Sequence, residues 1–193
     1  MTAPGPDGWP RCPWAVATPD YLAYHDDEWG RPVHGDDAIF ERLTLEAFQS
    51  GLSWLTILRK REGFRRAFSG FALDAVAAYG PADVERLLAD AAIVRNRRKI
   101  EAAIHNARAA LALPGGLSAL VWSYAPDPTA HPAPRAAADP PASTAASAAL
   151  ARELRGRGFV FVGPTTVYAL MQACGLVDDH VEGCLRRGAS EDR

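Results

Sequence analysis

Apolar residues recur at helical spacing through most of this 193-residue chain. They fall three or four positions apart, which places them on one face of a helix. Glycine and proline separate the periodic segments, at Gly51, Gly70, Gly80 and Pro81. The pattern predicts helices at 19–29, 36–50, 53–68, 72–78, 81–91, 97–113, 143–155 and 165–174, and a last short helix after Asp178.

Strand-like alternation is scarce, and the sequence FVFVG at 159–163 is the one short candidate. Residues 117–124 should dock a Trp and a Tyr onto the body, and an irregular loop is expected at about 125–141. The sequence therefore predicts a compact all-α fold. The expected parts are a flexible N-terminus at 1–10, a single domain at 11–187 and a tail at 188–193.

One acidic residue, Glu46, falls on the apolar face of its predicted helix. Asp36 and Asp37 could cap this helix, and Ile39, Leu43 and Glu46 follow one another at i, i+4 and i+7. A buried carboxylate is costly unless it has a partner. Glu46 is therefore either a core residue bonded to a neighbouring amide or a group that meets a ligand.

Composition is that of a globular protein, with 48% hydrophobic and 23% charged residues. The formal net charge of −2 gives no global argument for nucleic acid. No run of about 18 apolar residues could span a membrane, and no N-terminal stretch resembles a signal peptide. We therefore expect a cytoplasmic protein whose three cysteines are thiols or metal ligands.

Basic residues cluster at 59–66, 95–99 and 152–158. Such runs usually form solvated helix faces, and they also suit a DNA backbone. The run at 95–99 joins two predicted helices through a short link. This arrangement is expected of a helix-hairpin-helix, placed here at about 81–110, in which a helix N-terminus and nearby cations hold a phosphate.

A possible metal site involves both ends of the chain. In the sequence HVEGC, His180 and Cys184 stand at i and i+4, where they would share one face of a helix. Near the other end, Cys12 and His25 supply the same two ligand types. Together they would complete a Cys₂His₂ zinc site with no open position. The spacing is not that of a zinc finger, so buried cysteines and surface histidines remain the alternative.

Five stretches resemble, in order and spacing, the bacterial DNA-3-methyladenine glycosylase I family of the helix-hairpin-helix glycosylase superfamily. They are RCPWAVATPDYLAYHDDEWG, LEAFQSGLSW, RNRRKI, RGFVFVG and MQACGLVDDHVEGC. The resemblance implies a monomeric enzyme that acts on double-stranded DNA containing alkylated adenine. Such an enzyme flips 3-methyladenine into a pocket and hydrolyses its N-glycosidic bond, giving free base and an abasic site.

The resemblance also implies residue roles. Glu46 matches the pocket carboxylate, and it would pair with the positive charge that N3 methylation gives the base. Trp54 matches a residue that stacks on the base, and Trp14, Tyr21 and Tyr24 match aromatics that line the pocket. Aromatic faces suit a flat cationic ring.

Gly51 and Leu52 match a hairpin whose apolar tip fills the gap left by the flipped nucleotide. The remaining matches are the DNA backbone contacts Arg95, Arg97, Arg98 and Lys99, and the ligands of one structural zinc per chain, Cys12, His25, His180 and Cys184.

A catalytic Asp beyond the hairpin, present in most of the superfamily, has no counterpart in HNARAALALPGGLSAL. Lys60 and Lys99 lie in basic runs, so no lysine nucleophile is expected. The competing interpretation is a zinc-containing DNA-binding or damage-sensing protein without glycosylase activity.

Overall fold

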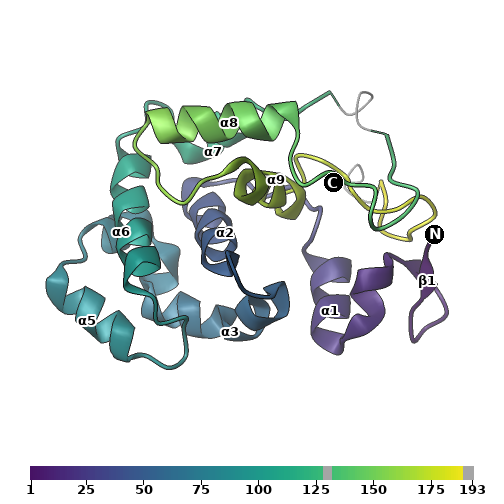
Figure 1. The fold of residues 1–193 in the computed structure, drawn as a ribbon, viewed down its shortest axis with the longest axis horizontal. Coiled ribbons are helices and arrows are strands. Elements are labelled where there is room, and N and C mark those ends of the chain that lie inside the picture. Colours follow the sequence, from purple (N-terminus) through teal and green to yellow (C-terminus); the bar gives the residue numbers. More distant parts are fainter. Residues whose placement is uncertain (128–131, 189–193) are drawn as a thin grey trace.

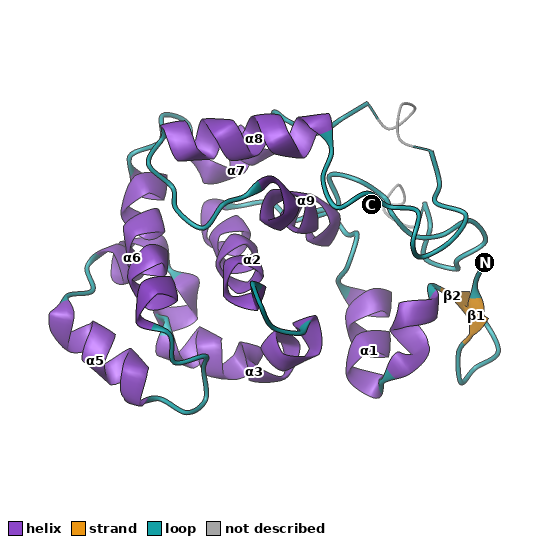
Figure 2. Ribbon diagram, in the orientation of Figure 1, coloured by secondary structure: helices purple, strands orange, loops and turns teal. Residues whose placement is uncertain are grey.

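The computed structural model describes residues 1–127 and 132–188, and this part of the chain is almost entirely helical (Figures 1 and 2). Residues 128–131 of the predicted loop and 189–193 of the predicted tail lie outside the described residues. The elements are β1 Ala3–Pro4, β2 Pro10–Arg11, η1 Pro13–Ala17, α1 Pro19–Asp27, α2 Asp36–Gln49, α3 Trp54–Ala67, η2 Ser69–Phe71, α4 Leu73–Ala77, α5 Pro81–Ala89, α6 Arg97–Leu111, α7 Gly116–Trp122, α8 Ala145–Gly156 and α9 Pro164–Ala173.

Helix α2 is the centre of the body and packs against α3, α6, α7 and α9 (Figure 1). Its apolar side chains Ile39, Phe40, Leu43 and Leu45 are fully buried. Helix α8 covers α9, and α4 covers α6. The all-α fold expected from the 3.6-residue periodicity is thus confirmed.

The start of α2 differs from the prediction. Its N-cap is Gly35, and no side chain caps it. The Asp36 carboxylate accepts a hydrogen bond from Ser118 N at 2.8 Å, and that of Asp37 accepts one from Leu73 N at 3.0 Å. The two acids therefore tie α2 to α7 and α4, while their charge favours the helix N-terminus.

The one strand candidate, at 159–163, does not form a strand. A strand needs a neighbouring backbone, whereas here the Asn106 side chain takes both backbone groups of Val160, with N···O distances of 2.9 and 3.0 Å. Phe161 follows with a φ of 57°, which breaks an extended conformation. Within the described residues, pairing is limited to the antiparallel β1 and β2, where the predicted flexible N-terminus at 1–10 meets the domain (Figure 2).

The predicted helix after Asp178 is also absent, so His180 and Cys184 do not share a helix face. The Asp178 carboxylate accepts hydrogen bonds from His180 N and Gly188 N, which closes a series of turns. Gly183 has a φ of 81°, a value that favours glycine over a helical residue.

The C-terminal segment returns to the N-terminus, where it joins a second small core. Leu185 N donates to Pro10 O at 2.9 Å, and Val181 N lies 3.4 Å from Cys12 Sγ. The predicted docking of Trp122 is confirmed by its indole N–H, which donates to Val33 O at 2.8 Å. Within residues 1–127 and 132–188 no helix has the length and apolarity needed to cross a membrane.

Candidate functional site

The four predicted metal ligands lie together and are buried. One donor atom from each of Cys12, His25, His180 and Cys184 lies within 4.8 Å of the others. His25 Nε2 is 3.1 Å from His180 Nδ1 and 3.4 Å from Cys184 Sγ. His180 Nδ1 is 3.7 Å from each sulfur.

The outer nitrogen of each imidazole in this cluster has an oxygen acceptor. His25 Nδ1 lies 2.8 Å from the Asp26 carboxylate, which Arg11 holds from its other side at 2.9 and 3.0 Å. His180 Nε2 lies 3.3 Å from Trp29 O. If each outer nitrogen carries the proton, both inner nitrogens present lone pairs to the cluster.

Two facing lone pairs and two thiol sulfurs, buried together, call for a cation between them. Zinc bonds of about 2.0–2.1 Å to nitrogen and about 2.3 Å to sulfur give tetrahedral edges of about 3.3–3.8 Å. Four of the six separations are 3.1 to 3.7 Å, close to that range, and all six are within 4.8 Å. The donor set therefore fits a four-coordinate metal ion.

A cavity of about 280 Å³ opens beside this cluster. Its volume suits a ligand smaller than most drug molecules. Tyr21 is fixed in its wall by a hydrogen bond from Leu55 N to the hydroxyl, at 3.1 Å. The lining residues are Trp14, Tyr21, Tyr24, Trp29, Glu46, Gln49, Trp54, Ala169 and Gln172.

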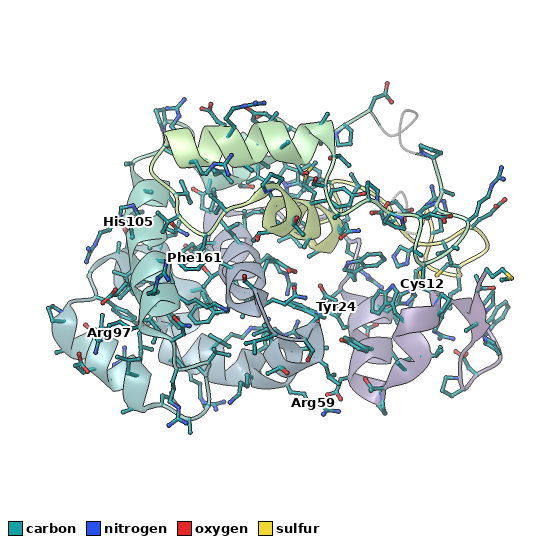
Figure 3. The ribbon with its side chains drawn as sticks, in the orientation of Figure 1. Cys12, Tyr24, Arg59, Arg97, His105 and Phe161 are labelled. Atoms are coloured by element: carbon teal, nitrogen blue, oxygen red, sulfur yellow. The ribbon has the colours of Figure 1, made fainter. Side chains whose placement is uncertain are left out.

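All five predicted pocket residues thus lie in one cavity, formed between the N-terminal segment, α1, α2, α3 and α9. The Tyr24 and Trp54 rings are 5.4 Å apart and tilted by 49°. Trp14 and Trp29 meet edge to face at 5.1 Å, and Trp29 meets the His180 ring at 4.7 Å. The Cys₂His₂ cluster therefore contacts the aromatic wall directly. In Figure 3, Tyr24 and Cys12 lie on the α1 side of the molecule.

Glu46 is 7% exposed, and its carboxyl forms no hydrogen bond with the described residues. The predicted alternative of a core glutamate bonded to an amide is therefore not what the structure contains. Burial raises the pKa of Glu46 from 4.5 to about 8, and the Arg42 guanidinium only partly offsets this effect. The indole N–H of Trp54 is likewise buried without a partner among the described residues. Two of the lining residues, Glu46 and Trp54, thus carry polar groups without a hydrogen-bond partner among the described residues.

The turn between α2 and α3 projects a hydrophobic tip. Gly51 has a φ of 80°, and Leu52 is 41% exposed. The Lys99 ammonium of α6 donates to Phe48 O at 2.9 Å and Ser50 O at 2.6 Å, which satisfies carbonyls at the end of α2. Lys99 thus stabilises this turn through hydrogen bonds, a role that its place in a basic run did not indicate.

Several other cations of the basic runs form ion pairs within the described residues. Within the described residues the run at 59–66 is tied to the acids around it, as solvated helix faces usually are. The pairs are Arg59 with Asp20, Arg61 with Glu28, Arg65 with Glu41 and Glu62, and Arg157 with Glu153.

The basic residues of the run at 95–99 differ in their contacts. Arg97 pairs with Glu85 at 2.7 Å and lies at the α5–α6 side of the molecule (Figure 3). Arg95 and Arg98 form no ion pair with the described residues. The Arg98 guanidinium lies 5.9 Å above the exposed Phe161 ring. Arg95 and Arg98 are therefore the cations of this run that remain available.

Four lining residues were not predicted: Trp29, Gln49, Ala169 and Gln172. Trp29 stands in the same quoted N-terminal stretch as the predicted aromatics, so its spacing could have indicated it. Gln49 follows Glu46 by three positions and thus shares its helix face. Ala169 and Gln172 carry no sequence signal, because α9 reaches the pocket only through packing on α2.

The fold and pocket define a helical protein whose aromatic cavity contains a buried carboxyl group. The sequence model of the methyladenine glycosylase family matches residues 14–187, and the chain belongs to this family.

Similar proteins agree with this assignment. The chain is 47% identical to DNA-3-methyladenine glycosylase 1 of Escherichia coli K12, over 90% of this chain and 95% of the relative. It is 40% identical to DNA-3-methyladenine glycosylase of Haemophilus influenzae, over 90% and 96%. The structure of 3-methyladenine DNA glycosylase I from Staphylococcus aureus, described for its recognition of 3-methyladenine, superposes with a TM-score of 0.85 at 35% identity, over 92% and 96%.

Proposed function

We propose that this chain is a DNA repair glycosylase that removes 3-methyladenine from double-stranded DNA, leaving an abasic site. The observation that carries the proposal is the unpartnered carboxyl of Glu46 inside an aromatic cavity. The activity for which the two relatives are named supports it, since each relative aligns with 90% of this chain. We propose that it acts as a cytoplasmic monomer.

The pocket chemistry suits a cationic base. The flipped ring stacks between the faces of residues such as Tyr24 and Trp54, and its charge is met by Glu46. As the N-glycosidic bond breaks, its electron pair goes to the base, which leaves neutral. Water then adds to the sugar C1′ and loses a proton. A methylated base is a good leaving group, so binding and orientation account for much of the catalysis.

The expected reaction stops at the abasic site. Strand cleavage by β-elimination needs an amine that forms a Schiff base with the sugar. Lys60 Nζ donates to Ala91 O, and Lys99 Nζ donates to the end of α2. Both lysines therefore have backbone partners, and neither lines the cavity.

We propose one zinc ion per chain, bound by Cys12, His25, His180 and Cys184. Four protein ligands would leave no coordination position for a catalytic water, so the ion would be structural. It would join the N-terminal segment to the C-terminal turns. It would also hold Trp29 through the His25 ring, which stacks on Trp29, and the His180 ring, which meets Trp29 edge to face.

We propose that Gly51 and Leu52 form a wedge and that Arg95 and Arg98 contact the DNA backbone at the hairpin formed by α5 and α6. Of the other two predicted backbone contacts, Arg97 is paired with Glu85 and Lys99 supports the turn that carries the wedge. A leucine side chain entering the duplex would offset part of the stacking lost on flipping. The N-terminus of α6 would add its dipole near a phosphate.

Arg95→Ala with Arg98→Ala should weaken duplex binding equally on damaged and undamaged DNA. Each lost phosphate contact lowers the slope of log K against log salt by about 1, so the double variant should lose about 2. Binding measured over a salt series checks this result. Arg97→Ala is the matched comparison and should lose less, because Arg97 already pairs with Glu85. A double variant with the parental slope would place the DNA track on another surface.

The proposed activity is tested by release of free bases from methylated duplex DNA. The parent protein should release 3-methyladenine and leave 7-methylguanine in the strand. Binding of the methylated duplex without base release would favour the competing function, a damage-sensing DNA-binding protein.

A further inference from the structure

Arg42 lies on α2 one helical turn before Glu46 and is largely enclosed by the protein. Its side chain is 14% exposed, and its Nη2 donates to Glu28 Oε2 at 3.2 Å. Its Nη1 is buried and has no hydrogen-bond partner within the described residues. A buried donor without a partner costs free energy, so packing alone does not account for an arginine here. The positive charge of Arg42 is the property that remains to be explained.

Glu28, the C-cap residue of α1, divides its carboxylate between two arginines. Besides Arg42, it accepts hydrogen bonds from Arg61 of α3, with N···O distances of 2.5 and 2.6 Å. Burial by itself would raise the pKa of Glu28, but the hydrogen bonds and charges of the two arginines lower it below its usual value. Glu28 is therefore ionised at neutral pH. Two cations and one anion leave this network with one positive charge in excess.

The excess charge lies next to Glu46. Residues four apart share one face of a helix, with about 5–6 Å between their Cβ atoms, so the Arg42 and Glu46 side chains are neighbours. Burial raises the pKa of Glu46 to about 8, and the charge of Arg42 acts against this rise. From α3 to the cavity the four side chains alternate in sign, in the order Arg61, Glu28, Arg42 and Glu46.

No second charged group acts on the Glu46 carboxyl within the described residues. From α1, Tyr21 and Tyr24 line the same cavity, and at the end of α9 Cys174 is fully buried. Burial raises the pKa of Tyr24 well above its usual value and that of Cys174 to about 12, so both stay neutral near pH 7. Of the helices packed on α2, α7 has no ionisable side chain, and the Lys99 ammonium of α6 is bound to carbonyls at the end of α2.

We propose that Arg42 is a positioning residue for Glu46: its charge, only partly neutralised by Glu28, lets the cavity carboxyl ionise at a lower pH than burial alone would allow. The proposal rests on the proposed glycosylase function, because a cationic base pairs with a carboxylate and not with a carboxylic acid. A fully neutralised Arg42 would leave Glu46 protonated to a higher pH. An Arg42 bound directly to Glu46 would occupy the carboxylate that the base needs. Sharing of Glu28 between two arginines avoids both outcomes.

The titration of Glu46 in the free protein tests this proposal directly. NMR of the carboxyl carbons follows it, and Glu46→Gln identifies the signal by its loss. Arg42→Met should raise the midpoint by about one pH unit, as expected for the loss of one partly neutralised charge. Glu28→Gln should lower the midpoint, because the two arginines then lose the anion that they share. Arg42→Lys keeps the charge and should keep the midpoint near that of the parent.

Arg65→Met is the matched control, because Arg65 of α3 pairs with Glu41 of α2 at 2.8 Å but is not one of the groups that act on Glu46. It should leave the midpoint unchanged. Arg42→Met and Glu28→Gln both loosen the same network, so a merely structural role would shift the two midpoints in the same direction or shift neither. Either result, or an equal shift on Arg65→Met, would overturn the proposal. Thermal melting checks that each variant keeps its fold, and the comparison of Arg42→Met with Arg42→Lys decides if Glu28→Gln does not fold.

Excision provides an independent readout of the same effect. At pH 7 and low substrate concentration, Arg42→Met should slow release of 3-methyladenine about 10-fold, the fall in the ionised fraction of Glu46 that one pH unit produces. Arg42→Lys should restore the parental rate. A parent protein that releases no 3-methyladenine would refute the proposed function, whatever the titration shows. Release of 3-methyladenine by the parent, with a midpoint that Arg42→Met leaves in place, would refute the proposal on Arg42 alone.

Discussion

Glu46→Gln is expected to slow excision of 3-methyladenine by about 10-fold or more, the loss that corresponds to about 1.4 kcal/mol of charge interaction. Glutamine keeps the size and the hydrogen-bonding reach but cannot become negative. The cationic base then loses its partner, while neutral adenine loses nothing. Single-turnover excision on methylated duplex DNA measures the effect. Some activity should remain, because the methylated base is already a good leaving group.

The raised pKa of Glu46 adds a pH signature to this result. At neutral pH the carboxyl of the free protein is largely protonated, and binding of a cationic base drives its ionisation. Excision at low substrate concentration should therefore rise with pH up to about 8 and then level off. Glu46→Gln should remove this rise. A variant with parental rates and a parental pH profile would show that Glu46 is only a core residue.

The same variant should be more stable than the parent at neutral pH. In the unfolded chain Glu46 loses its proton near pH 4.5, whereas in the folded chain it keeps it to about pH 8. The stability contributed by the protonated carboxyl is therefore complete below pH 4.5 and is lost as pH rises through this window. Glu46→Gln escapes a penalty on the order of 3 kcal/mol at pH 7. Urea unfolding at pH 5 and pH 7.5 compares the two proteins, and equal pH dependence would contradict the assignment.

Cys12→Ser should abolish stoichiometric metal binding and lower stability by several kcal/mol. Structural zinc contributes on the order of 10 kcal/mol in peptides, and less is expected where a core already exists. Loss of the ion would leave two imidazoles and a thiol buried without a partner, and it would loosen the aromatic wall. Elemental analysis should find one zinc in the parent protein and none in the variant, and calorimetry should show the lower melting temperature.

Cys174→Ser is the matched control, because Cys174 is a fully buried cysteine that does not belong to the Cys₂His₂ cluster. This variant should keep its zinc, although burial of a hydroxyl will lower its stability somewhat. A metal-free parent protein that is as stable and as active as the zinc-bound protein would contradict the zinc proposal. Retention of zinc by Cys12→Ser would remove Cys12 from the ligand set.

The Cys₂His₂ cluster and the pocket are connected by side-chain contacts. Arg11 holds Asp26, Asp26 holds His25, and the His25 ring stacks on Trp29, which lines the cavity. Loss of the ion should thus affect base binding as well as stability, through the position of the aromatic wall. Because the Cys₂His₂ cluster contacts the pocket wall, segments near both ends of the chain help to shape the pocket.

The sequence by itself determined the helices, because the spacing of apolar residues and the positions of glycine and proline are local properties. Helix α2 and its buried Glu46 could be predicted in this way. The residues of the metal cluster and of the aromatic wall could be recognised by resemblance, which compares order and spacing along the chain. Even so, the predicted helix at His180 and Cys184 was wrong, and their ligand atoms meet through turns closed by Asp178.

Only the tertiary structure decided which side chains have partners. Lys99 looks like another cation of a basic run, yet it satisfies carbonyls at the end of α2, a helix some fifty residues earlier in the chain. Gln172 has no local signal, and its amide nitrogen donates to Asp179, which is folded back against α9. Hydrogen bonds between distant segments are set by packing, and packing is not periodic along the chain. The sequence therefore indicated the chemistry available to the pocket, while the fold decided how each polar group in it is directed.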